Sequence, residues 1–117
     1  MKLKRTIISI VALMLAVCLM PTALAATWYL EDGDITVIAN ENGQSVKQGN
    51  NDAVADSDTV ITQRDSEKAT DNTITVSTTD DATANITIED VNINSCGDAI
   101  DVGSSGANIT LEGDNKL

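Results

Sequence analysis

One stretch of sequence recurs in the second half of the chain and limits what the chain can fold into. Ala84–Asn94 reads ANITIEDVNIN, and 23 positions later Ala107–Leu117 reads ANITLEGDNKL. An extended motif that returns after about two dozen residues is typical of a parallel β-solenoid, in which equivalent residues of successive coils stack on one another. The recurrence therefore predicts parallel pairing of the two stretches, with Ile86 beside Ile109.

Short β-branched segments follow the same pattern after residue 72. The first and third begin at positions 74 and 100, and the second and fourth at positions 86 and 109, which predicts two strands per coil in two separate sheets. A third strand per coil, at Val91–Ile93, is an open alternative. Inward Ile and Val with outward Thr and Asp would leave a narrow apolar core. An antiparallel β-sandwich, which also has short, closely spaced strands, is the competing fold. The four segments are Ile74–Val76, Ile86–Ile88, Ile100–Val102 and Ile109–Leu111.

Residues 1–25 have the pattern of a secretory signal peptide. A basic start precedes an apolar run over residues 7–20, and the small-residue site Ala23-Leu24-Ala25 follows it. The run is shorter than the roughly 20 residues that span a bilayer, which disfavours a membrane anchor. A lipoprotein signal at Cys18 is disfavoured because the larger Val17 precedes it. We therefore expect cleavage after Ala25, a secreted or bacterial cell-surface location, and no membrane span in the mature chain.

Cleavage would make the chain more acidic. Residues 26–117 keep four basic residues and 18 acidic ones, a formal net charge of −14, which argues against a nucleic-acid partner. The chain has no Phe and one residue each of Trp and Tyr, so the core must be aliphatic. We expect Trp28 and Tyr29 to cap the first coil and Arg64 to pair with a neighbouring acid. Cys96 is left without a disulfide partner, and we expect it to be a small buried residue in a turn.

Composition divides the mature chain near residue 72. Residues 26–71 are predicted to be N-terminal cap strands and polar loop: two short strands around a turn at Asp32-Gly33, then mostly loop with one short apolar segment, Val60-Ile61. Residues 72–117 are predicted to form the β-solenoid coils. Because a stable solenoid needs about three repeats, we expect these to be N-terminal coils of an array truncated at Leu117.

The register of the repeat also brings polar side chains together. Asn85 would stack on Asn108, and Glu89 on Glu112, across strands about 4.8 Å apart. Carboxylates this close require solvation, protonation of one member or a shared cation, and Ca²⁺ prefers such oxygen ligands. A solvated acidic face is the alternative. The hypothetical Ca²⁺ site consists of Glu89, Asp90, Glu112 and Asp114.

Five segments carry a resemblance to a known family: TWYLEDGDITV, NTITV, ANITIEDVNI, AIDV and ANITLEGDN. Together they resemble the N-terminal part of the secreted carbohydrate-binding domain proteins of clostridia-like bacteria. That family is similar to right-handed parallel β-helix proteins that bind acidic plant polysaccharide with Ca²⁺. The resemblance implies a non-catalytic, polysaccharide-binding protein, with polygalacturonate or pectin as partner. A structural or adhesive surface protein and a β-helix polysaccharide lyase remain alternatives.

Overall fold

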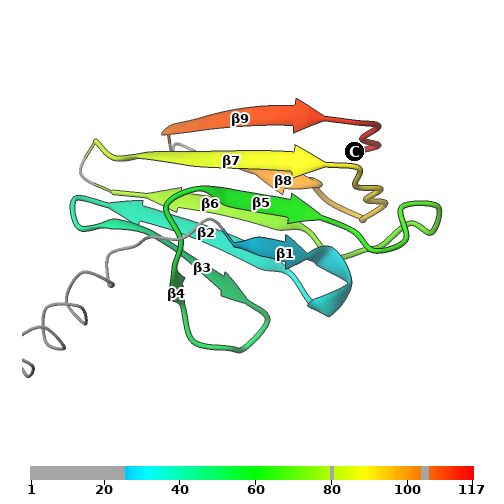
Figure 1. Ribbon diagram of the computed structural model, residues 1–117, viewed down its shortest axis with the longest axis horizontal. Helices are drawn as coiled ribbons and strands as arrows, with labels where there is room; N and C mark the ends of the chain where they lie inside the picture. The colour runs from blue at the N-terminus through cyan, green and yellow to red at the C-terminus, as the bar shows by residue number, and fades with distance from the viewer. Residues whose placement is uncertain (1–25, 80, 104–105) are drawn as a thin grey trace, which may run out of the picture.

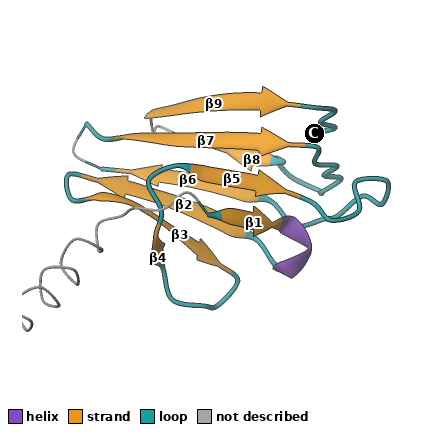
Figure 2. Ribbon diagram, in the orientation of Figure 1, coloured by secondary structure: helices purple, strands orange, loops and turns teal. Residues whose placement is uncertain are grey.

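The computed structural model describes residues 26–79, 81–103 and 106–117 of the chain. The expected signal peptide, Cys18 included, lies outside the described residues. Those residues form β-strands and one single-turn 3-10 helix, η1 (Leu30–Asp32), drawn purple in Figure 2. No helix within them has the length and apolar character needed to cross a membrane.

The strands form two sheets that lie one behind the other in Figure 1. The first, which we call sheet A, has the order β1-β5-β7-β9, and all its neighbouring strands are parallel. The second, sheet B, has the order β4-β3-β2-β6-β8; β2, β6 and β8 are parallel, whereas β3 is antiparallel to both β2 and β4. The strands of sheet A are β1 (Thr27–Tyr29), β5 (Thr59–Thr62), β7 (Thr83–Glu89) and β9 (Gly106–Glu112). Those of sheet B are β2 (Ile35–Asn40), β3 (Gly43–Gln48), β4 (Val54–Ala55), β6 (Ile74–Thr78) and β8 (Ile100–Asp101).

The strand register confirms the prediction that alternate β-branched segments lie in two separate sheets. Ile74 of β6 pairs with Ile100 of β8 in sheet B, so the first segment lies beside the third. Ile86 of β7 pairs with Ile109 of β9 in sheet A, so the second lies beside the fourth. From β5 onward the chain alternates between the sheets, so β6 and β8 run opposite to β5, β7 and β9 (Figure 1). The antiparallel β-sandwich alternative is wrong, because sheet A is parallel throughout.

The core is the narrow space between the two sheets. Along β2 and β6 every second residue is buried, so Ile35, Val37, Ile74 and Val76 face sheet A while Ile38 and Thr75 lie on the opposite face. Trp28, on the edge strand β1, is half-buried and packs against this core. The buried apolar residues are Leu30, Ile35, Val37, Ala39, Val46, Ile61, Ile74, Val76, Ala84, Ile86, Ile88, Val91 and Ile93.

The N-terminal part is more ordered than the sequence predicts. The apolar segment Val60-Ile61 lies in strand β5, but β3 and β4 lie in the region predicted to be mostly loop. Loop still makes up most of residues 40–71, but long-range polar contacts, which follow no periodic pattern, order additional strands there. The predicted turn at Asp32-Gly33 is also more than a tight turn, since η1 precedes Gly33 and carries the chain from β1 in sheet A to β2 in sheet B.

The alternative third strand at Val91–Ile93 is not formed, and two isolated bridges occur there instead. Thr70 pairs with Ile93, and Asn92 pairs with Lys116, both in parallel. Cys96 follows in an exposed bend, so the expectation of a buried cysteine is wrong. Val91 and Ile93 fill the core at this level, and the chain has already turned outward at Cys96.

Candidate functional site

Acidic side chains gather where the strands of sheet A end. Because these strands are parallel, the segments that follow them lie at the same end of the sheet, on the right in Figure 1; they are residues 30–34, 63–73, 89–94 and 112–116. We call this end of sheet A the acidic corner. It carries Glu31, Asp32, Asp34, Asp65, Glu67, Asp71, Glu89, Asp90, Glu112 and Asp114, against Arg64, Lys68 and Lys116. Because ten carboxylates face only three basic groups, the acidic corner is strongly negative.

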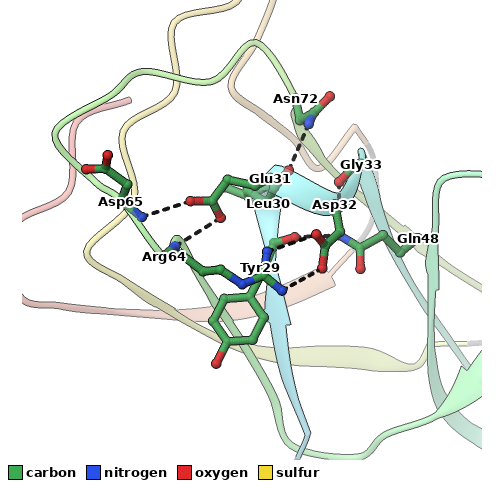
Figure 3. A network of polar contacts seen from close by, with 9 residues as sticks. All are labelled: Tyr29, Leu30, Glu31, Asp32, Gly33, Gln48, Arg64, Asp65 and Asn72. Atoms are coloured by element: carbon green, nitrogen blue, oxygen red, sulfur yellow. Dashed lines mark hydrogen bonds and ion pairs between the residues drawn. The ribbon is translucent and has the colours of Figure 1, made fainter.

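A polar clasp joins the first two segments of the acidic corner (Figure 3). The backbone N–H groups of Arg64 and Asp65 donate to the two carboxylate oxygens of Glu31, at 2.9 and 2.8 Å. The Arg64 guanidinium donates to both oxygens of Asp32, at 2.9 and 3.0 Å, and lies 4.2 Å from the centre of the Tyr29 ring. The expectation that Arg64 pairs with an acid is therefore confirmed, with Asp32 as the partner.

The clasp shifts the pKa of each charged group in it. The hydrogen bond from Arg64 is the main cause that lowers the pKa of Asp32, and the same bond raises the pKa of Arg64. For Glu31, partial burial is the largest single cause and raises the pKa, but the hydrogen bonds from the backbone of Arg64, Asp65 and Glu31 itself, together with the charge of Arg64, lower the net pKa. Both acids are therefore held in the ionised form, which suits a brace between segments rather than a proton donor.

The predicted Glu89 and Glu112 pair is present. The two residues are direct partners in the β7–β9 register, and the Asn85 and Asn108 partners confirm the amide ladder with a hydrogen bond of 3.0 Å between their side chains. Asp90, however, has a backbone function, because its Oδ1 accepts the N–H of Asp114 at 2.9 Å. All four predicted residues therefore lie in one region, but the carboxylate of Asp90 is already hydrogen-bonded to the backbone.

Two amide side chains brace the corner, and sequence patterns did not reveal them. Gln63 donates from Nε2 to the carbonyls of Asp65 and Lys68, and its Oε1 accepts from the backbone of Asn92. Asn115 donates from Nδ2 to the carbonyls of Ile88 and Glu112, and its Oδ1 accepts the N–H of Val91 at 2.9 Å. Each amide ties one segment of the acidic corner to the next, which fixes the shape of the surface.

Two open depressions lie along the corner. The first, of about 590 Å³, is lined by Glu31, Gln63, Asp65, Lys68, Ala69, Thr70, Asp71 and Asn94. The second, of about 530 Å³, is lined by Ser66, Glu67, Val91, Asn92, Gly113, Asp114, Asn115 and Lys116. Both linings present carboxylate, amide and ammonium groups, so the surface can exchange hydrogen bonds with a polar ligand.

The carboxylates of the described residues do not form a complete metal site by themselves. Among the described residues, no three side chains of His, Cys, Asp or Glu come together as metal ligands. Ca²⁺ takes six to eight oxygen ligands. Glu89 and Glu112 supply carboxylates from adjacent strands, and Asp90 is engaged with the backbone of Asp114. An ion at this position would have to take most of its oxygens from water or from a bound ligand.

Comparison with protein-family models, curated proteins and solved structures finds no match for this chain. The likeness to secreted carbohydrate-binding proteins, which depends on short segments, therefore stays a prediction.

Proposed function

We propose that this chain is a secreted or cell-surface, non-catalytic protein that binds an acidic polysaccharide along its acidic corner. The fold that we infer for it is a right-handed parallel β-solenoid. Its residues 26–71 form the capped beginning, and its residues 72–117 form regular coils.

Alternation between the sheets supports the solenoid. From β5 to β9 successive strands belong to alternate sheets, and β7, β8 and β9 each pair in parallel with the strand two places earlier. That connectivity describes a coil with two strands per turn, and the steps from Ile74 to Ile100 and from Ile86 to Ile109 give its period. Crossovers between parallel strands are almost always right-handed, which is the reason for the proposed hand.

The observation that carries the binding function is the row of stacked loops at the acidic corner. Consecutive loops of sheet A line two neighbouring depressions, the first over residues 31–94 and the second over residues 66–116. Both linings include residues from the loop after β5, so the depressions adjoin. A row of this kind suits an extended, hydroxyl-rich polymer better than a compact apolar ligand, which would need an enclosed apolar pocket.

Charge determines how an acidic polymer could bind. A mature chain with a formal net charge of −14 repels a polyanion unless a cation lies between them. We propose that Ca²⁺ fills this place beside Glu89 and Glu112. Since the described residues offer too few ligands for a resident ion, binding of Ca²⁺ should depend on the polymer. The acidic corner would then bind a uronate chain only when Ca²⁺ is present.

Retention on immobilised polygalacturonate tests this function. The exported protein is expected to bind in the presence of Ca²⁺ and to elute with a chelator, and the double variant Glu89→Gln/Glu112→Gln should lose most of the retention. Glu41→Gln is the matched control, because Glu41 is an exposed acid in the β2–β3 turn, away from the acidic corner. Retention that a chelator leaves unchanged would remove the ion bridge, and no retention on any uronate polymer would refute the binding function.

A structural or adhesive role is the second candidate, and the exposed side of β9 favours it. β9 is at the edge of sheet A, and Leu111, whose stacking partner Ile88 is buried, is 57% exposed. An apolar strand edge invites a further strand. Concentration-dependent association in sedimentation, together with no binding across a glycan panel, would favour this role. Release of unsaturated uronate would instead indicate a lyase.

A further inference from the structure

A buried carboxylate lies under the first described residue of the chain. Asp56 is 0% exposed. Its Oδ2 accepts the indole N–H of Trp28 at 2.7 Å, and its Oδ1 accepts the N–H groups of Asp58 at 3.1 Å and of Ala26 at 3.3 Å. Burial of an ionised carboxylate is costly unless an opposite charge or several donors compensate it.

All of these donors are neutral in the unprocessed chain. Among the described residues, the ion pair between side chains joins Arg64 to Asp32, and no lysine or arginine pairs with Asp56. Three N–H groups solvate the Asp56 carboxylate, but within the described part of the chain nothing neutralises it. A positive charge at this position would therefore interact with it strongly, because water is excluded.

Signal cleavage would supply that charge. Ala26 directly follows the expected cleavage site, Ala23-Leu24-Ala25. A signal peptidase that hydrolyses the Ala25–Ala26 bond adds one water molecule. Ala25 departs with a new carboxylate, and the nitrogen of Ala26 becomes a primary amine, which takes up a proton at neutral pH. The amide N–H that donates to Asp56 thereby becomes an ammonium group.

We propose that Asp56 is the receiving site for the α-ammonium group of mature Ala26, so that removal of the signal completes the N-terminal edge of the fold. Ala26 is already held next to β5, because its carbonyl accepts the N–H of Val60 at 3.2 Å. Asp56 is fixed as well: its N–H donates to the carbonyl of Gln44 at 3.0 Å, and its carbonyl accepts from the side chains of Gln44 and Thr59. Both partners are therefore in place before cleavage, and hydrolysis changes only the charge.

The arrangement makes stability depend on where the mature chain starts. One additional residue before Ala26 would turn its nitrogen back into a neutral amide and move the ammonium group away from Asp56. The exported protein should consequently be more stable than any N-terminally extended form. This consequence is independent of polysaccharide binding, since it concerns the β1 edge and not the acidic corner.

The test uses the full chain, expressed with its own signal and recovered after export. Intact-mass measurement should show Ala26 as the first residue. A second form carries Gly-Ser inserted between Ala25 and Ala26, so that cleavage after Ala25 leaves two additional residues. Its thermal midpoint is expected to be lower by at least about 5 °C. In the Asp56→Asn background the same insertion should have almost no effect, because the amide cannot form the ion pair.

Equal midpoints for the two forms with Asp56 intact would overturn the proposal, as would a mature chain that begins elsewhere or an insertion effect that persists with Asp56→Asn. A chemical measurement applies even if Asp56→Asn fails to fold. In the folded wild type the α-amine of Ala26 should react with acetic anhydride at least about tenfold more slowly than in urea, and the exposed Lys47 serves as internal reference. Equal rates would also overturn the proposal.

Discussion

The two halves of the folded chain are ordered by different interactions. In residues 72–117, apolar side chains stack in register between successive strands, as Ile86 does on Ile109. In residues 26–71, side-chain amides and carboxylates bind distant backbone groups, and an antiparallel hairpin is added to sheet B. The comparison shows that stacked apolar side chains order the strands after residue 72, whereas the strands before it are held to a large part by polar side chains.

The largest expected effect is in the regular half. Ile88 is fully buried, and its partner in the repeat, Leu111, is 57% exposed. Ile88→Ala should lower the free energy of unfolding by about 3 to 4 kcal/mol, because it leaves a cavity between the sheets. Leu111→Ala should lower it by less than about 1 kcal/mol. Urea unfolding followed by circular dichroism measures both, and equal losses would show that the two side chains are buried alike.

The next effect is in the polar half. Gln48 is 7% exposed, and its Nε2 donates to the carbonyls of Tyr29 at 2.7 Å and Gly33 at 3.1 Å. Gln48→Ala leaves two carbonyls without this donor and should lower the free energy of unfolding by about 2 kcal/mol. The adjacent Lys47 is exposed, so Lys47→Ala is the control and should change stability by less than about 0.5 kcal/mol. A loss for Gln48→Ala no larger than for the control would mean that the amide does not hold the cap.

The same contrast explains how far the sequence predicted the fold. The β-branched segments and the recurrence of ANIT predicted the strands after residue 72, their assignment to two sheets and their register, because the apolar residues that stack in the sheets also recur in the sequence. The strands β3 and β4 were missed because Gln44 and Gln48 act on backbone groups that no local pattern identifies. Apolar periodicity reports burial, and the cap depends on hydrogen bonds.

The candidate site divides along the same line. The Glu89 and Glu112 pair was predicted, since it follows from the register of the repeat. The Arg64–Asp32 ion pair joins residues that are distant in the sequence and share no motif, so the identity of the partner could not be predicted. The use of Asp90 as a backbone acceptor depends on its positive φ of 52°, which the motif does not show.

A smaller effect is expected at Gly113, where the second copy of the repeat differs from the first. Gly113 takes the position of Asp90 in the second copy of the repeat and has a φ of +73°, and a Cβ on it would overlap the Asp90 carboxylate, with Cγ 2.7 Å away. Gly113→Ala should therefore lower the free energy of unfolding by about 1 to 2 kcal/mol. Gly97→Ala is the matched control, because no atom lies within 4 Å of a Cβ built there. Equal urea midpoints for the two variants would show that the last loop adapts to the added methyl group.

The smallest effect concerns the two ends of the acidic corner. The pKa of Glu31 is lowered in the folded chain, since the effect of its partial burial is outweighed by the backbone hydrogen bonds that it accepts and the charge of Arg64 together. A carboxyl with a lowered pKa stabilises the fold at pH values above its ordinary range, and this contribution disappears as the pH falls through the folded value. Urea midpoints measured from about pH 6 to pH 3 should therefore fall less steeply for Glu31→Gln than for the wild type.

Glu112→Gln provides the comparison from the other end of the corner. There the amide of Asn115 holds the backbone, through the carbonyl of Glu112 and the N–H of Val91, and no charge is involved in those bonds. This variant should keep the steeper acid response of the wild type. If Glu112→Gln flattened the response as much as Glu31→Gln, the clasp at Glu31 would have no special part in the acid sensitivity. Repulsion among the ten carboxylates of the corner could not replace the clasp as the cause, because protonation at low pH relieves that repulsion and stabilises the fold.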